Sequence, residues 1–243
     1  MNFILDIGNN FSKFTVFESN QIVGFGTWDS NQIIDEFDNW IQKNKKCDYI
    51  IVSDVKGINT SLFEDKAKCK VVWASPKLKW PFKVKYKTTE TIGVDRLGLA
   101  AAAVTNYPNQ DCLIIDLGTC ITYDFIDRNK LYYGGAISPG LIMRYNSLNS
   151  QTSMLPKLEF KIPDSIIGES TTESIHSGIF NGIVGEIKNH ILEYQKIFGN
   201  IIIILTGGDA DKLSNQIKNG IFANYKFFAK GLHAVLELNK LKN

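Results

Sequence analysis

The chain has 243 residues, of which 44% are hydrophobic and 12% aromatic, and its formal net charge at pH 7 is +2. This composition predicts a globular protein, built as one large domain or two half-size domains. The small charge argues against a nucleic-acid-binding surface, and no apolar run reaches the roughly 18 residues that a membrane-spanning helix needs. We therefore expect neither nucleic acid nor a membrane as a partner.

The cysteines bear on metal binding and on location. None of them shows the Cys-x-x-Cys spacing that is typical of zinc sites. We expect reduced thiols, no zinc, and a cytoplasmic location. The four are Cys47, Cys69, Cys112 and Cys120.

In the first half of the chain, apolar periodicity predicts three strands, followed by a helix, a strand, a helix and a strand. The helical pattern is clearest over residues 31–44, and an alanine-rich helix is expected over 91–104. The other predicted segments are strands 3–5, 14–17, 21–27, 49–53 and 70–73, and helix 60–68.

From residue 111 the same pattern restarts. Residues 151–163 contain two prolines and little periodicity, which predicts a loop. The predicted segments are strand 112–115, a returning strand through 123, strand 132–137, a helix through 148, helix 172–198, strand 200–205, and helices 212–218 and 228–241. The repeated order is that of a ribonuclease-H-like half-domain, an α/β architecture.

Two hairpins with an Asp-x-Gly turn lie at corresponding places in the two halves. They contain Asp6-Ile7-Gly8 and Asp116-Leu117-Gly118, each directly after a short apolar strand. Glycine lets a ligand approach the backbone, turn N–H groups can bind an anion, and a carboxylate can hold a metal ion. A single such motif is equally typical of an ordinary β-turn. The repeat favours two half-domains that bind one phosphorylated ligand.

Each hairpin carries a further polar side chain. Lys13 can reach a β- or γ-phosphate as a point charge, although a solvated lysine would give the same sequence. Thr119 can donate to a phosphate while Asp116 holds a cation, and turn capping is the alternative interpretation.

The segment Gly93-Val94-Asp95-Arg96 lies at the start of the alanine-rich helix. Asp95 could accept a proton from an alcohol while Arg96 holds an anionic substrate, as phosphoryl transfer requires. A salt-bridged helix cap is the alternative. The three histidines lie on predicted helices without ligand spacing, and we interpret them as structural.

Three other segments stand out by composition. Residues 134–140 (GGAISPG) are dense in glycine and are expected to line a ligand. Residues 206–208 follow a predicted strand, where open α/β sheets bind ligands, although a plain turn explains them equally well. In residues 77–87 lysines alternate with aromatic side chains, a pattern that fits single-stranded nucleic acid or a protected edge strand, and we favour the edge strand.

Taken together, these residues resemble the type III pantothenate kinases, within the superfamily of acetate kinase, sugar kinases, heat-shock ATPases and actin. The motifs follow the family's order over nearly the whole chain. They are DIGNNFSK (6–13), GVDR (93–96), DLGTCITYD (116–124), GGAISPG (134–140), SMLPKLEF (153–160) and GESTTESIHSG (168–178).

The resemblance implies two tandem ribonuclease-H-like, actin-like ATPase half-domains with mixed sheets, which we place at residues 1–108 and 109–243. It implies ATP-dependent phosphorylation of the primary hydroxyl of pantothenate to 4'-phosphopantothenate, the first step of coenzyme A biosynthesis. Asp95 would be the general base, Mg²⁺ would accompany ATP, and Asp116 would hold a monovalent cation, potassium or ammonium.

The resemblance also implies a homodimer with the substrate site at the interface. The residues implied to bind pantothenate are Tyr86, Gly93, Val94, Asp95, Arg96 and Thr171. Those implied to bind ATP are Asp6, Ile7, Gly8, Asn9, Asn10, Phe11, Ser12, Lys13 and Thr119.

Three positions depart from the pattern of the family. Asn10 stands where threonine is commoner, Cys120 where alanine is, and Ser170 where asparagine is frequent. Neither Asn10 nor Cys120 removes a charge. Three rival interpretations remain at this point. They are a non-catalytic ATP-binding regulatory or transcription accessory factor of the same fold, another actin-like kinase or phosphatase, and, as the least favoured, a structural actin-like filament protein. The presence of both Asp95 and Arg96 favours the pantothenate kinase.

Overall fold

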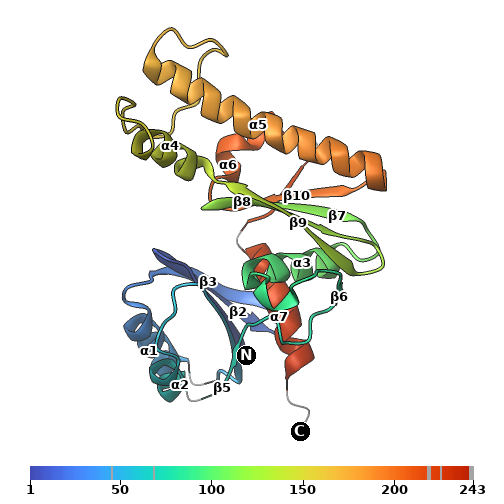
Figure 1. The fold of residues 1–243 in the computed structure, drawn as a ribbon. Helices are drawn as coiled ribbons and strands as arrows, with labels where there is room; N and C mark the ends of the chain where they lie inside the picture. The colour runs from blue at the N-terminus through green and yellow to red at the C-terminus, as the bar shows by residue number, and fades with distance from the viewer. Residues whose placement is uncertain (45, 68, 218–219, 225, 241–243) are drawn as a thin grey trace. The chain divides into compact units, whose positions relative to one another are not determined.

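The computed structural model describes residues 1–243 except 45, 68, 218–219, 225 and 241–243. The chain forms two compact units (Figure 1). Unit 1 contains residues 1–108 together with helix α7 (Lys226–Asn239), and unit 2 contains Asn109–Asn224. The predicted second half-domain, 109–243, is therefore wrong at its end, because α7 packs its apolar stripe into the core of unit 1.

Unit 1 contains the strands and helices predicted for the first half, with ends that differ by up to three residues. The helix predicted over 60–68 ends at Ala67, and residue 68 lies outside the described residues. The strands are β1 (Asn2–Ile7), β2 (Phe11–Glu18), β3 (Gln21–Asp29), β4 (Tyr49–Asp54), β5 (Lys70–Trp73) and β6 (Lys83–Val84). The helices are α1 (Ile33–Lys43), α2 (Thr60–Ala67), the 3₁₀ turn η1 (Thr89–Thr91), α3 (Val94–Asn106) and α7.

Unit 2 adds one strand that was not predicted, the two-residue β11. The predicted ends at 218 and 241 lie outside the described residues. The strands are β7 (Cys112–Leu117), β8 (Cys120–Ile126), β9 (Leu131–Pro139), β10 (Ile202–Thr206) and β11 (Ile221–Phe222). The helices are α4 (Leu141–Ser150), α5 (Thr171–Phe198), α6 (Ala210–Leu213) and the 3₁₀ turn η2 (Ser214–Gln216). In the described part of the chain, no helix has the length and apolar character needed to span a membrane.

The two units share one strand topology. Unit 1 has the order β3-β2-β1-β4-β5, and the strands of unit 2 follow the equivalent order β9-β8-β7-β10-β11. In each unit an antiparallel meander is extended by two parallel strands. The prediction of two tandem ribonuclease-H-like half-domains with mixed sheets is confirmed.

The sheet of unit 1 is buried on both faces. Alternation along β1 sends Phe3, Leu5 and Ile7 to the face covered by α1 and α2. Ile4 lies on the opposite face, in a core built with residues of α3 and α7. Because Asp6 shares the alternation of Ile4, it lies on the α3 side, and this placement decides the surroundings of its carboxylate.

Helices α3 and α7 cross at close range because small residues line the crossing. A Cβ atom added at Gly231 would collide with the carbonyl oxygen of Gly98 and the backbone of Ala102. One added at Gly98 would collide with the ring of Phe228. The alanine-rich sequence of α3 therefore favours the helix and also allows α7 to pack closely against it.

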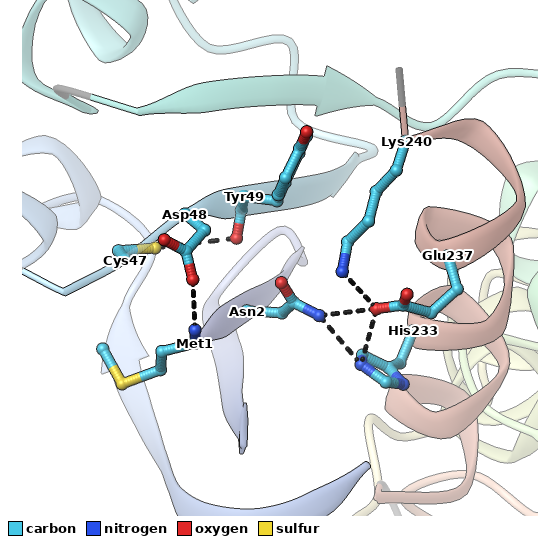
Figure 2. Close-up of polar contacts among 8 residues, drawn as sticks. All are labelled: Met1, Asn2, Cys47, Asp48, Tyr49, His233, Glu237 and Lys240. Carbon is cyan, nitrogen blue, oxygen red and sulfur yellow. Dashed lines mark hydrogen bonds and ion pairs between the residues drawn. The ribbon is translucent and has the colours of Figure 1, made fainter. Parts of the chain in front are cut away.

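A polar cluster fastens α7 to the start of β1 (Figure 2). Asn2 Nδ2 donates to Glu237 Oε1 at 2.7 Å and lies 3.0 Å from His233 Nε2. Burial lowers the pKa of His233, and its ring stacks on Phe17 with 4.1 Å between ring centroids. A neutral, stacked imidazole fits the structural role predicted for this histidine.

The core of unit 2 lies between its sheet and helices α4, α5 and α6. Leu113, Ile115 and Leu117 of β7 face this core. Alternation places Asp116 on the opposite face of the sheet, away from α5.

We predict that Gly231→Ala lowers the free energy of unfolding by about 1–3 kcal/mol, because the added methyl group meets backbone atoms that cannot move aside. The matched control is Gly185→Ala in α5, where an added Cβ has no neighbour within 4 Å among the described residues. That change should raise stability by up to about 1 kcal/mol. Urea unfolding of both variants measures the difference, and equal effects at the two sites would contradict the close crossing.

Candidate active site

Four polar side chains form a row across the sheet of unit 1. Asp6 of β1 is the register partner of Lys13 on β2 and of Ser53 on β4. Lys13 is in turn the partner of Thr27 on β3. Register partners project from the same face of a sheet, so the row runs Thr27, Lys13, Asp6, Ser53. It crosses the carboxyl ends of β1 and β4, the edge at which open α/β sheets bind ligands.

The turn of the first hairpin is anchored through its backbone. A Cβ atom at Gly8 would lie 2.7 Å from the carbonyl oxygen of Phe11, so only glycine fits there without a shift. The backbone N–H of Ser30 donates to the carbonyl oxygen of Asn10 at 3.0 Å. The buried hydroxyls of Ser12 and Ser30 are 2.7 Å apart. The hydrogen bond from Ser30 anchors Asn10 through its backbone carbonyl, so the asparagine side chain at this position leaves the anchor intact.

The carboxylate of Asp6 is electrostatically coupled to its neighbours. Burial raises the pKa of Asp6 to about 6. Lys13 and Ser53 act in the opposite direction and lower this pKa, whereas the charge of Asp95 raises it by a smaller amount. Asp95 therefore lies close to the first hairpin. The fold explains this proximity, because α3 covers the face of the sheet from which Asp6 projects.

Asp95 lies in the first turn of α3, two residues after the N-cap residue Gly93. Its Oδ1 accepts a hydrogen bond from the backbone N–H of Arg96 at 2.8 Å, and the side chain is exposed. A Cβ atom at Gly93 would collide with that Oδ1. Gly93 thus makes room for the carboxylate, a positioning role that differs from the substrate contact implied by the resemblance.

Arg96 is buried, with 5% of its surface exposed. Its guanidinium carbon lies 5.9 Å from the centroid of the Tyr86 ring, within the range of a cation–π contact. The structure therefore brings together Tyr86, Asp95 and Arg96, three residues that the sequence analysis assigned to one substrate site.

The second hairpin occupies the equivalent place in unit 2. Asp116 of β7 is the register partner of Thr122 on β8 and of Thr206 on β10. Gly207, with φ of +98°, brings its backbone against Asp116 Oδ1 and the carbonyl oxygen of Leu117. Oxygen atoms of this kind are the ligands that hard cations prefer.

The turn of this hairpin is held by the start of α4. The N–H of Gly140 donates to the carbonyl oxygen of Thr119 at 3.2 Å, and a Cβ there would collide with the carbonyl oxygens of Gly118 and Thr119. The N–H of Gly118 donates to the carbonyl oxygen of Cys120 at 3.0 Å. Gly135 instead lies against the carbonyl of Tyr123, so pairing of β8 with β9 explains that glycine.

Thr171 is the first residue of α5. The N-cap before it is Ser170, whose Oγ accepts a hydrogen bond from the N–H of Glu173 at 3.2 Å. Serine and asparagine are both preferred N-caps, which explains why Ser170 can stand in place of asparagine. A cavity of about 370 Å³ lies beside this helix end. It is lined by Lys161, Pro163, Asp164, Ser165, Ile167, Glu169, Glu173 and His176.

The remaining histidines also have structural partners. His176 Nδ1 is 2.7 Å from the hydroxyl of Tyr145, and His190 stacks on Tyr123 with 3.9 Å between ring centroids. Within the described ranges, no group of three or more His, Cys, Asp or Glu residues is arranged to hold a metal ion. Ser53 and Thr27 were missed by the sequence analysis. Only strand register marks them, and register is hard to obtain from one sequence.

We predict a pH dependence of stability that originates at Asp6. Its native pKa of about 6 lies above the ordinary 3.8, so the folded state binds the proton more tightly than the unfolded chain. The resulting stabilisation is fully present below pH 3.8 and is lost as the pH rises through 6. Asp6→Asn should therefore gain up to about 3 kcal/mol relative to wild type between pH 4 and pH 8.

Urea unfolding of the ligand-free protein across this pH range measures the gain. Asp35→Asn is the matched control, because Asp35 is an exposed acid in the first turn of α1. A difference between Asp6→Asn and wild type that does not change with pH would contradict the raised pKa.

Three comparisons with known proteins give a consistent result. A sequence model of the type III pantothenate kinases matches residues 2–193. The type III pantothenate kinase of Flavobacterium johnsoniae is 43% identical over 229 residues, covering 94% of each chain. That of Christiangramia forsetii is 42% identical over 241 residues, covering 99% of each chain.

The structural comparison supports the fold alone. A ROK family glucokinase from Streptomyces griseus covers 98% of both chains with a TM-score of 0.52 and 11% sequence identity. The sequence matches extend over most of the chain and include both hairpins and the segment that carries Asp95. The chain belongs to the type III pantothenate kinase family.

Proposed function

We propose that this kinase transfers the γ-phosphoryl group of ATP to the primary hydroxyl of pantothenate, with Asp95 as the general base. The product is 4'-phosphopantothenate, and the reaction is the first step of coenzyme A biosynthesis. We assign Asp95 as the base because it lies close to Asp6. This proximity brings the exposed carboxylate of α3 close to the first phosphate hairpin within a single unit.

In the proposed step, Asp95 accepts the proton of the pantothenate hydroxyl while the hydroxyl oxygen attacks the γ-phosphorus. The bond from that phosphorus to the β,γ-bridging oxygen breaks, and ADP leaves. Phosphoryl transfer depends mainly on positioning and electrostatic stabilisation, with one base. The bond from the Arg96 N–H to Asp95 Oδ1 fixes the carboxylate, which meets the positioning requirement.

The buried guanidinium of Arg96 would bind the carboxylate end of pantothenate. Its contact with the Tyr86 ring restricts its position, so less side-chain entropy is lost when the anion binds. Gly93 and Val94 would complete this side of the site through their backbone at the start of α3.

On the nucleotide side, residues 6–13 and Thr119 would bind ATP, which enters with its divalent metal ion. Lys13 would contact the phosphates as a point charge. Asp116 would hold a monovalent cation, potassium or ammonium. Asp116 suits a cation because its surroundings are rich in oxygen: the Leu117 carbonyl and the Asp116 carboxylate both lie against Gly207. Such a cation would offset the crowded phosphate charge.

We further propose that the enzyme is a cytoplasmic homodimer in which Thr171 completes the pantothenate site of the partner subunit. Support comes from the exposed start of α5, where Ile166 and Ile167 just before the helix are 71% and 74% exposed. Exposed apolar side chains at one helix end are typical of a contact surface.

The first test is ATP consumption with pantothenate as acceptor, with and without potassium. We expect turnover to require both, and Asp95→Asn to lower kcat by about 10²–10⁴-fold. Asp35→Asn, the same charge change in the first turn of α1, should keep wild-type turnover. Tight ATP binding without pantothenate-dependent turnover would instead support a regulatory protein.

The shared site predicts complementation between two inactive variants. Asp95→Asn and Thr171→Glu should each be inactive alone, the second because it repels the substrate carboxylate. In a mixed dimer, one of the two sites receives both wild-type residues. After the variants are mixed 1:1 and the subunits have exchanged, we expect about a quarter of wild-type activity. No recovery despite proven exchange would show that each site lies within one subunit.

A further inference from the structure

An arginine of α4 forms an ion pair with a glutamate of α5 in unit 2. Nη2 of Arg144 donates to Oε2 of Glu186 at 2.5 Å, and the hydroxyl of Tyr123 donates to the other oxygen, Oε1, at 2.8 Å. Burial acts to raise the pKa of Glu186, but the hydrogen bonds that it accepts outweigh burial and hold its pKa below the ordinary value. Glu186 is therefore an ionised carboxylate that fixes Arg144.

The same guanidinium also binds the turn between β9 and α4. Its Nε donates to the carbonyl oxygen of Pro139 at 2.9 Å, and its Nη2 donates to the hydroxyl of Ser138 at 2.8 Å. The side chain of Arg144 thus folds back over the start of its own helix. A guanidinium has five N–H donors in a rigid plane, so it can hold the glutamate and the turn together.

The turn that Arg144 binds supports the second hairpin. Pro139 is the register partner of Cys120. The next residue, Gly140, donates its N–H to the carbonyl oxygen of Thr119 at 3.2 Å and leaves no room for a Cβ atom there. The side chain of Thr119 is exposed. The hairpin turn is therefore fixed through its backbone while the threonine side chain remains accessible.

We propose that Arg144 is a positioning residue for ATP binding: held by Glu186, its guanidinium fixes the turn 138–140, and this turn keeps Thr119 in place for the phosphates. The proposal rests on the ATP-binding role proposed for Thr119. Arg144 acts through the turn and does not touch the nucleotide. A turn that is already ordered loses less conformational entropy when the ligand binds, so the arginine contributes to nucleotide affinity.

The test separates MgATP affinity, measured by calorimetry in potassium without pantothenate, from stability, measured by urea unfolding. Arg144→Gln should lower stability, because Glu186 loses its cationic partner, and should raise the Kd of MgATP about 10-fold. Arg144→Lys keeps the charge but lacks the planar fork, so most of the stability should return while the Kd stays raised about 3–10-fold. In both variants the KM for ATP should rise and the KM for pantothenate should not.

The matched control is a second arginine–carboxylate pair in unit 2. Arg128 donates through Nε and Nη2 to Oδ2 of Asp111, at the ends of β8 and β7 that lie away from the hairpin turn. Arg128→Gln should lower stability and leave the Kd of MgATP unchanged. A raised Kd in this control would show that affinity merely follows the stability of unit 2, and would overturn the proposal. An unchanged Kd in both Arg144 variants would also overturn it.

A double-mutant cycle distinguishes this proposal from the proposed function on which it rests. Thr119→Ala should raise the Kd of MgATP about 10-fold, through loss of a hydrogen bond to a charged group. In that background, Arg144→Lys should have a smaller effect than in wild type, because the side chain that it positions is already lost. Fully additive effects would refute the role of Arg144 alone, whereas an unchanged Kd in Thr119→Ala would refute the ATP contact itself.

Discussion

The burial of β1 on both faces is the constraint on which unit 1 depends. One face must supply an apolar layer for α1 and α2, and the other must accept α3 and α7. Within six residues the strand satisfies both, and its alternation leaves Asp6 on the α3 side. A slip of one residue would send this carboxylate into the apolar layer around Phe3 and Leu5. The chemistry of the site is therefore tied to the strand register that builds the core.

The two units share one topology and differ in the residues beside the acid of each hairpin. Each ends its first strand in an acid followed by a glycine turn, and each pairs that acid with a hydroxyl on the parallel neighbour. The antiparallel partner differs, since Lys13 faces Asp6 whereas Thr122 faces Asp116. A cationic neighbour suits the proposed place of Asp6 near phosphate charge, and a neutral neighbour suits the cation site proposed at Asp116. The repeat supplies the same backbone arrangement, and single residues distinguish the two hairpins.

The sequence predicted the repeated fold and the pairing of Asp95 with Arg96, because periodicity and short motifs are local signals. Tyr86 was grouped with these two residues only through the resemblance to the family. Sequence analysis failed where packing between distant parts of the chain determines the structure. Nothing in the pattern of α7 shows which half receives it, since an amphipathic stripe fits any apolar face. Within 77–87, the predicted edge strand is limited to β6, Lys83–Val84. Ser53 was missed because an ordinary serine at a strand end becomes notable only when register and burial are known.

The place of α7 in the fold has a consequence for synthesis of the chain. The helix that closes the core of unit 1 is made after the whole of unit 2. Domains generally fold in order as they leave the ribosome. During synthesis, Ile4 and Ile51 in the sheet of unit 1 therefore remain uncovered by α7 until residues 109–224 have been made. Unit 2 can thus reach its native state first, and chains cut short before α7 would expose an apolar face that invites aggregation.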